Sequence, residues 1–359
     1  MKIKISILIL AAVLSTPRAG VAGNSAGTTS ALFLRHEPTA RVTAMGGALA
    51  ALDDESGAAY FNPAALGNMR EHRLSFSAWS GVDENSRETF MSGIYHAGAR
   101  GVFTLNYLRH SSGKEDIYDL GGNLSSVELS DEYALGAGWG YKLSGNLAAG
   151  AQAKMVKSKL AENYDDRTGT VDAGILATTD NGRFSLGAGV QNAVGELKYI
   201  NAGDPLPTII YGGAAMRFDM GAMGKLLLAA DLHKPRDERS ADAHAGAEYK
   251  KDILALRLGV KRVSGDNSVT AGGGITFRWA SFDYGFQAAG ELNQQVHKFT
   301  LNILFGGAKT GDEKAAAQAM SDNAQPQTSG AAPGTAAEEQ PAPEPEPQQE
   351  LPEAPAMPL

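Results

Sequence analysis

The feature that most constrains this chain is a period of two in the side chains of residues 70–305. Residues 254–260, for example, read LALRLGV, with a large apolar side chain at every second position. Turn signals such as Asn181-Gly182 divide this region into about fourteen segments of about ten residues. The segments start near residues 72, 87, 100, 128, 146, 168, 183, 205, 225, 241, 253, 268, 281 and 296. The pattern predicts an all-β chain that forms a transmembrane antiparallel β-barrel of about fourteen strands.

A soluble β-sandwich or propeller also alternates, because one face of each sheet covers a dry core. Two features of the segments favour the membrane barrel. Their polar positions are rich in Gly, Ser, Thr and Gln, which suits a narrow polar lumen. Aromatic residues gather near the expected strand ends, where a membrane interface would lie: Tyr95, Tyr107, Trp139, Tyr141, Tyr211, Tyr249 and Trp279.

Residues 1–22 have the pattern of a secretory signal peptide. Lys2 and Lys4 precede an apolar run from Ile5 to Leu14, and small residues follow up to Ala22. The run is too short to cross a bilayer as a helix, so we expect export and cleavage after Ala22. The sequence contains no cysteine, which excludes disulfides, thiolate zinc sites and lipid attachment through an N-terminal cysteine.

Residues 306–359 differ in composition from the rest of the chain. They hold nine of the 15 prolines and nine acidic residues against two lysines. Repeated prolines can neither continue a helix nor pair within a sheet, so we expect a disordered Pro/Ala/Glu-rich tail in the periplasm. Most of the formal charge of −8 lies in this tail, and nothing in the charge pattern indicates nucleic-acid binding.

The most specific motifs stand before the strands. Residues 38–48 read PTARVTAMGGA, Asp53-Asp54 follows, and residues 59–66 read AYFNPAAL. Further motifs lie at residues 206–212, 231–237, 246–259 and 282–301. Together they resemble, in the same order, the motifs of the PorV/PorQ family of outer-membrane proteins, relatives of the FadL fatty-acid channels. In this sequence Phe61 stands at the family's usual Trp and Ala65 at its usual Gly.

The resemblance implies a fourteen-stranded barrel in residues 70–305, with residues 23–69 folded into the lumen as a hatch. The hatch motif comprises Arg41, Met45, Gly46, Gly47, Asp53, Asp54, Tyr60, Asn62 and Pro63. The glycines allow the backbone to pass close to the barrel wall. Asn62 and Pro63 are typical of a helix start, which predicts a short helix from Ala64 to Met69. The sequence leaves open whether the hatch is a gate or a passive plug.

Charged residues at inward positions of the strands are expected in the lumen, because charges cost free energy in lipid. The lumen-facing candidates are Asp231, His233, His244, Glu248, Arg257, Arg278, Asp283 and Lys298, together with Lys154 and Lys261. Paired between hatch and wall, they would either hold a gate or simply fix the hatch, and we favour the second interpretation.

No catalytic or metal-binding motif stands out. The seven histidines (36, 72, 96, 110, 233, 244 and 297) lack metal-ligand spacing, and no serine lies in a G-x-S-x-G context. We interpret His233 and His244 as lumen-lining residues rather than metal ligands. The acidic run at residues 53–55 could bind a hard cation, but a solvated turn or ion pairs with basic lumen residues are favoured. We therefore expect no enzyme activity, no cofactor and no metal.

Three functions remain for such a barrel in the outer membrane of a Gram-negative cell, in contact with lipid and lipopolysaccharide. The first is transport of hydrophobic small molecules, which predicts an apolar pocket beside the hatch and a lateral gap in the wall. The second is a protein-interaction barrel that binds an envelope or secreted protein, as in type IX secretion. The third is a structural envelope protein. In each case an even strand number predicts that both termini lie in the periplasm.

Overall fold

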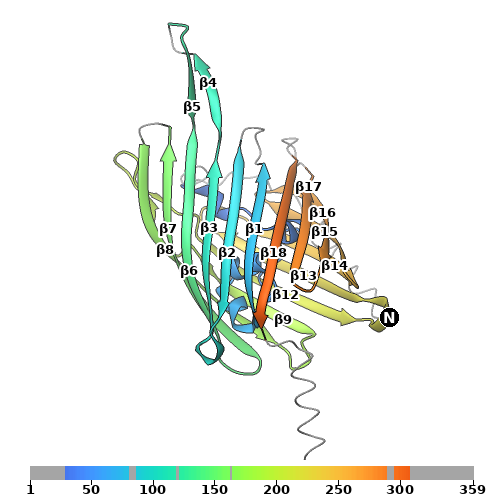
Figure 1. Ribbon diagram of the computed structural model, residues 1–359. Helices are drawn as coiled ribbons and strands as arrows, with labels where there is room; N and C mark the ends of the chain where they lie inside the picture. The colour runs from blue at the N-terminus through green and yellow to red at the C-terminus, as the bar shows by residue number, and fades with distance from the viewer. Residues whose placement is uncertain (1–28, 81–85, 119–120, 162–163, 289–294, 308–359) are drawn as a thin grey trace, which may run out of the picture. The chain divides into compact units, whose positions relative to one another are not determined.

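The computed structural model describes residues 29–80, 86–118, 121–161, 164–288 and 295–307. These residues form a closed barrel of fourteen antiparallel strands around an N-terminal segment (Figure 1). The barrel closes by pairing of the first wall strand with the last. The wall strands are β1 (Glu71–Ser80), β2 (Arg87–His96), β3 (Val102–Ser111), β6 (Ser130–Lys142), β7 (Leu147–Leu160), β8 (Tyr164–Thr178), β9 (Phe184–Gln191), β12 (Ile209–Asp219), β13 (Lys225–Pro235), β14 (Asp242–Lys251), β15 (Leu254–Val263), β16 (Asp266–Thr276), β17 (Ala280–Gln287) and β18 (Val296–Gly307).

The alternation of the sequence decides which side chains face out. Leu256 and Leu258 on β15 are each 66% exposed on the outer face, whereas Arg257 between them is 3% exposed inside the barrel. An outer surface of apolar side chains around a polar interior is what a barrel in lipid requires. The predicted fold class is confirmed and the strand starts agree to within four residues; the largest displacements are at β8, from residue 168 to 164, and at β12, from residue 205 to 209.

The connections make the two ends of the barrel different. At one end, called the turn end, short turns such as residues 143–146 and 252–253 join the strands. The longer connections lie at the opposite end, called the loop end. One of them holds a hairpin of β4 (Lys114–Tyr118) and β5 (Leu124–Glu128) that rises beyond the rim (Figure 1). Another holds a small sheet of β10 (Glu196–Leu197) and β11 (Asp204–Pro205). The sequence did not predict either pair.

The N-terminal segment, residues 29–69, lies inside the barrel and is called the hatch. Its short helices are η1 (Leu32–Arg35), α2 (Ala40–Ala44), α3 (Ser56–Phe61) and η2 (Pro63–Asn68). Only the last was predicted, as a helix from Ala64 to Met69; it is a 3-10 helix, and the Asn62 side chain caps it by accepting from the Ala64 amide. The described part of the chain contains no helix that is both long enough and apolar enough to span a membrane.

The hatch passes through the lumen from the loop end to the turn end. Ser30 bonds to the loop-end residue Pro205, whereas Met69 leads into β1 at the turn end. The described chain therefore begins and ends at opposite ends of the barrel, because Gly307 lies at the turn end. Residues 1–28 and 308–359, which include the expected signal peptide and tail, lie outside the described residues.

Apolar side chains of the hatch pack against the wall in three clusters. At the loop end, Phe33 and Leu34 pack with Phe90 and Leu108 of the wall. In a second cluster, Val42, Met45, Leu49 and Leu52 pack with wall residues such as Leu176 and Leu227, which stand toward the turn end of β8 and β13. At the turn end, Leu66 and Met69 pack with Ile94 and Val102. The interior is thus a packed core along much of its length.

Two rows of wall glycines let the hatch backbone approach the strands. The first row runs across β14–β17 and consists of Gly246, Gly259, Gly272 and Gly285. The second runs across β6–β8 and consists of Gly140, Gly150 and Gly174, which are direct partners in the strand register. A Cβ on Gly285 would lie 2.4 Å from the Ala40 carbonyl oxygen, and one on Gly150 would lie 2.3 Å from that of Pro63. Both contacts are shorter than packed atoms allow.

Two expectations about side-chain orientation are wrong. Arg278 does not face the lumen: β16 ends at Thr276, and Arg278 lies exposed in the following turn, where strand alternation no longer applies. Tyr211 does not belong to an interfacial girdle. It stands at an inward position of β12, is 3% exposed, and its ring packs on Phe61 of the hatch with centroids 4.4 Å apart.

Candidate functional site

The hatch is bound to the β14–β17 wall through Arg41. Its guanidinium donates to both carboxylate oxygens of Glu248 at 2.8 and 2.9 Å and to both oxygens of Asp54 at 2.8 and 3.2 Å. Helix α2 positions Arg41 directly above the first glycine row, which brings the backbone close enough for this reach. A planar guanidinium suits such paired contacts, and the ion pair with Glu248 is almost fully buried.

The network continues within the wall. Arg257 donates to Glu248 at 2.6 Å and to Asp283 at 2.7 Å, so that two arginines share the Glu248 carboxylate. These residues come from β14, β15 and β17, and each stands at an inward position. Lys250 of β14 also approaches Glu248, at 3.2 Å, so the wall supplies two carboxylates and two cations, and the hatch supplies Arg41 and Asp54.

Asp53, Asp54 and Glu55 do not converge on one point, so they do not form the cation site that the sequence allowed. Asp53 accepts from Arg217 at 2.6 Å, Asp54 binds Arg41, and Glu55 caps α3 by accepting from the Gly57 and Ala58 amides. Asp53 and Asp54 therefore pair with basic residues of the lumen, as the interpretation of the acidic run as ion-pairing residues expects, whereas Glu55 binds only backbone amides of its own helix.

Neighbouring carboxylates of the hatch have opposite electrostatic environments. The Asp54 side chain is about half-exposed, and the Arg41 guanidinium outweighs its partial desolvation and holds the pKa of Asp54 well below its ordinary value. Burial raises the pKa of Glu55, and the charges of Arg41 and Arg73 only partly offset it. The Glu55 side chain is 2% exposed, and its Oε1 has no hydrogen-bond partner among the described residues. Low pH therefore favours the folded state through Glu55 and disfavours it through Asp54.

Backbone groups of the hatch also bind the wall. Asp231 accepts from the Leu49 and Ala50 amides at 2.7 and 2.8 Å. His244 Nδ1 lies 2.7 Å from the Gly46 carbonyl oxygen, so this ring nitrogen carries the proton. Gly46 and Gly47 both have positive φ, and a Cβ on Gly46 would lie 2.7 Å from the Ala245 oxygen. These contacts account for the glycine pair of the hatch motif.

Further ion pairs hold the hatch near the loop end. Glu37 binds Lys261 at 2.5 Å, and the Glu37 carbonyl accepts from Lys298. Burial alone would raise the pKa of Glu37, but the two lysines hold it well below its ordinary value. Arg35 binds Glu238 and Asp242. All the predicted lumen-facing residues except Arg278 are buried, and Lys154, which pairs with Asp172 at 2.8 Å, lies inside as well.

A cavity of about 300 Å³ lies between the hatch and the β9–β15 wall near the loop end. Its apolar lining comes from Leu34, Leu49, Tyr60, Phe61 and Ile209. The Phe61 ring stacks on His233 with centroids 4.7 Å apart, and His233 lies 4.2 Å from His244. Charged residues, including Arg35, Glu37 and Asp242, share the lining. The site is thus a hollow that combines aromatic and aliphatic side chains with charged ones.

The strand ladder is interrupted beside this cavity. Pairing between β8 and β9 ends at Ala173 and Val190, although β8 continues toward the loop end. The next residue of β9, Gln191, lines the cavity. Residues 192–208 cover the free edge of β8 through isolated bonds, such as the one from the Ala193 amide to the Val171 carbonyl at 3.0 Å. Regular strand pairing is therefore absent from this part of the described wall.

Two hollows on the outer face are of a different kind. One is lined by residues such as Leu74, Phe76 and Leu105, and the other by residues such as Leu254, Leu256 and Phe282. The named side chains are exposed on the outside of the strands. These hollows are grooves between side chains that would face lipid, so the cavity beside the hatch is the better candidate for a binding site.

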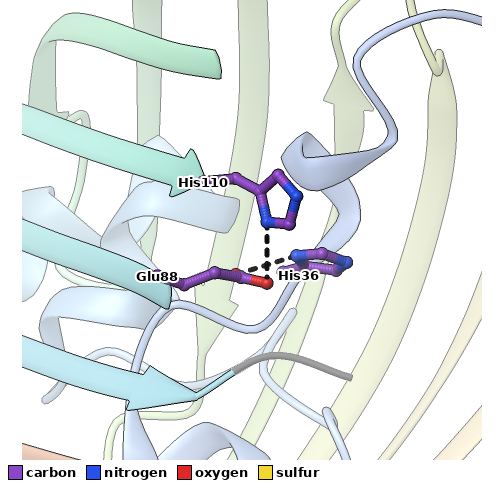
Figure 2. Close-up of side chains that lie close together, drawn as sticks. All are labelled: His36, Glu88 and His110. Carbon is purple, nitrogen blue, oxygen red and sulfur yellow. Dashed lines mark hydrogen bonds and ion pairs between the residues drawn. The ribbon is translucent and has the colours of Figure 1, made fainter. Parts of the chain in front are cut away.

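A second cluster of polar residues lies at the loop end, where the sequence gave no signal for it. His36 follows η1 of the hatch, and Glu88 and His110 stand on β2 and β3 (Figure 2). His36 Nδ1 lies 2.9 Å from one carboxylate oxygen of Glu88, and His110 Nδ1 lies 3.3 Å from the other. The three residues are separated by 52 and 22 positions, so no local spacing could indicate that they meet.

No family model and no curated protein matches this sequence. Several solved structures share its fold. The toluene transporter TbuX of Ralstonia pickettii aligns over 75% of this chain and 98% of its own, with 14% identity and a TM-score of 0.55. The toluene transporter TodX of Pseudomonas putida aligns over 74% of this chain and 96% of its own, with 14% identity and a TM-score of 0.51. The monoaromatic hydrocarbon channel CymD aligns over 76% of this chain and 98% of its own, with 12% identity and a TM-score of 0.53. At these identities the likeness shows the fold alone: this barrel is folded like the barrels of these channels.

Proposed function

We propose that this protein carries hydrophobic small molecules across the outer membrane and binds them in the cavity beside the hatch. The observation that supports this most directly is the cavity itself, which lies between Phe61 of the hatch and Ile209 of the wall. Binding sites for small molecules are typically hollows of about 300–1,000 Å³ with a mostly apolar lining and a few polar groups. The proteins of similar fold that are named as toluene and hydrocarbon channels agree with this ligand class.

The volume favours a single-ring aromatic compound. An apolar cavity of about 150 Å³ in another protein takes up benzene, so a hollow of about 300 Å³ has room for a substituted ring. The Phe61, His233 and Tyr60 rings line the hollow and give it the aromatic character that suits such a ligand.

The packed interior indicates the route. Below the cavity the lumen is filled by the hatch, which is fixed by Arg41 and by the close contacts of Pro63 with the wall. For a ligand that entered from the loop end, the path through the wall at the interrupted ladder between β8 and β9, beside Gln191, is shorter than the path through the filled lumen to the turn end. We propose that the ligand leaves sideways at this point into the membrane and that the hatch stays in place.

Binding to the purified, full-length protein in detergent tests this proposal. Radiolabelled toluene should bind in equilibrium dialysis, and Phe61→Glu should lower its affinity at least about tenfold, since a carboxylate in an apolar hollow opposes a neutral aromatic ring. Ile117→Ser is the matched control, because Ile117 lies in the exposed β4–β5 hairpin outside the barrel. Equal toluene affinity in Phe61→Glu and Ile117→Ser would contradict the proposal.

The fold and the apolar outer face support a place in the outer membrane. Short turns are periplasmic and long loops extracellular in barrels of this class, so we propose that the turn end faces the periplasm. The hatch motif at residues 38–66 supports membership of the PorV/PorQ family within the FadL-like fold. Protease digestion of intact cells should cut the β4–β5 hairpin but leave the turns at residues 143–146 intact.

A protein-interaction role is the second candidate, because the β4–β5 hairpin projects beyond the barrel rim (Figure 1). Its tip exposes apolar side chains, with Tyr118 72% and Leu124 56% exposed. Single exposed apolar residues are common, but a projecting hairpin with several of them favours a protein partner. A Tyr118→Ser and Leu124→Ser variant should lose any co-purifying envelope protein while its toluene binding stays unchanged.

A further inference from the structure

We propose that His36, Glu88 and His110 form a zinc site that fastens the start of the hatch to the barrel wall. Each carboxylate oxygen of Glu88 faces one imidazole, at 2.9 Å from His36 Nδ1 and 3.3 Å from His110 Nδ1 (Figure 2). All three residues can present a ligand atom within 4.8 Å of the others. The ligand atoms around tetrahedral zinc are about 3.3 Å apart, so only small side-chain shifts are needed.

The chemistry of the three groups selects the ion. Two imidazoles and one carboxylate are the ligand set of many zinc sites that keep a fourth position open for water. His36 is 42% exposed in its side chain and Glu88 only 4%, so the site is supported from inside and open to solvent on one side. Hard cations such as magnesium prefer oxygen ligands alone, which this cluster does not offer.

The surrounding charges make a dication acceptable. Glu132 stands opposite His110 in the strand register, is 8% exposed, and accepts from the Ser158 hydroxyl. On the other side Lys298 interacts with Glu88, but it is already engaged by the Glu37 carbonyl and the Trp79 ring. The cluster thus contains one buried carboxylate, Glu88, and has a second, Glu132, beside it, and zinc would neutralise part of their charge.

The cluster joins the hatch to the barrel wall, so a metal bound there would hold the two together. His36 belongs to the hatch, and the other two ligands belong to adjacent wall strands. His36 also lines the cavity beside the hatch. A metal bond at this point would hold residues 32–38, most of which line the cavity, more firmly than the hydrogen bonds described above. Zinc would thus act as a latch on the loop end of the hatch.

Isothermal titration of zinc sulfate into the full-length protein, purified in detergent without a histidine tag, tests the site. We expect about one zinc per barrel at pH 7.5. Loss of a residue that hydrogen-bonds to a zinc ligand lowers zinc affinity about 10–100-fold. His36→Ala removes a ligand itself, so it should lower the affinity by more than this. His297→Ala is the matched control, because His297 is an exposed histidine at the same end of the barrel and lies outside the cluster.

The outcomes separate clearly. One-to-one binding that is lost in His36→Ala and kept in His297→Ala supports the site. Absence of binding in the unaltered protein, or equal binding in both variants, overturns it. His36 is half-exposed at the loop end, so its removal should not prevent folding. Because imidazoles must lose their protons to bind zinc, the affinity should also fall between pH 7.5 and pH 5.5. An affinity independent of pH would count against the two histidines.

A mobility measurement tests the latch separately from the metal. The chain has no cysteine, so Leu32→Cys provides one labelling position, on a side chain that is 51% exposed in the hatch. Zinc should reduce the mobility of a spin label at this position and should have no effect when His36→Ala is also present. A label that responds equally in both backgrounds would show that zinc acts elsewhere.

Discussion

Two of the attachments between the hatch and the barrel use different physical means. At the charged anchor, Arg41 binds Asp54 and Glu248 against the β14–β17 wall. At the uncharged anchor, residues 63–68 lie on the glycines of β6–β8 and contribute no charged side chain. The first depends on ionisation and the second only on shape. The comparison teaches that one segment can be fixed to a barrel wall by charge and by shape, and that of these two anchors only the charged one responds to pH.

Removal of Arg41 should have the largest effect on this arrangement. Arg41→Ala leaves Glu248 with fewer partners in a site where it is 2% exposed, and breaking a buried ion pair costs about 3–5 kcal/mol. Guanidinium unfolding of the purified barrel, followed by tryptophan fluorescence, measures the loss. Ion conductance in planar bilayers should rise in the same variant if the hatch leaves the lumen.

Arg278→Ala is the control for this prediction, because Arg278 lies exposed in the turn after β16. Its free energy of unfolding should stay within about 0.5 kcal/mol of the unaltered protein. If the two variants lost the same stability, the charged anchor would not fix the hatch.

Crowding of the uncharged anchor should have an intermediate effect. A Cβ at position 150 would lie 2.3 Å from the Pro63 carbonyl oxygen, so Gly150→Ala forces η2 away from the wall. Added atoms in a packed interior cost about 1–3 kcal/mol. Because no ionisable group is involved, the cost measured by unfolding should be equal at pH 5 and pH 7.5.

Gly212→Ala provides a matched comparison on β12. A Cβ there meets its nearest neighbour at 3.9 Å, which is an ordinary contact. This variant should unfold as the unaltered protein does. A cost for Gly150→Ala that appeared only at neutral pH would show that the second attachment also depends on charge.

The smallest effect should come from Glu55. Its pKa is raised by burial, so the folded state favours the neutral acid, and stability is lost as the pH rises through the folded-state pKa. Glu55→Gln keeps an oxygen to cap α3 but carries no charge. It should raise the free energy of unfolding at pH 7.5 by on the order of 0.5 kcal/mol and leave it unchanged near pH 4.

Asp54→Asn should behave in the opposite way at the neighbouring position. The pKa of Asp54 is lowered, so its contribution is present above the ordinary pKa of about 3.9 and is lost as the pH falls toward the folded-state value. The side chain is 49% exposed, so water screens the pair and the loss at pH 7.5 should be modest. Unfolding curves with the same sign for both variants would contradict the assignment of the two environments.

Much of the fold could be predicted because alternation is a local property. Successive side chains of a strand point to opposite faces, so the pattern at residues 254–260 places Leu256 outside and Arg257 inside without any knowledge of neighbours. The same parity indicated Glu248 and Asp283 as lumen residues. It failed at Arg278, because a strand end is set by the turn that follows, and at Tyr211, where residue type was weighed above position.

The candidate site was less predictable, since its parts meet through the path of the hatch. The motif indicated Arg41 and Asp54, but not that Arg41 binds Glu248, which is 207 positions away. The cavity depends on how the Phe61 ring packs against Tyr211 of β12 and His233 of β13. The meeting of His36 with Glu88 and His110 depends in addition on the register between β2 and β3.

By itself the sequence determined the barrel, the face of each strand and the presence of a glycine-rich segment before the first strand. These follow from the period of two and from composition, which act over a few residues. Only the tertiary structure decided how the hatch crosses the lumen, which of the 43 glycines receive it, and where a cavity and a histidine cluster remain. Contacts between distant segments depend on strand register and on the packing of a unique interior, and no local pattern encodes either.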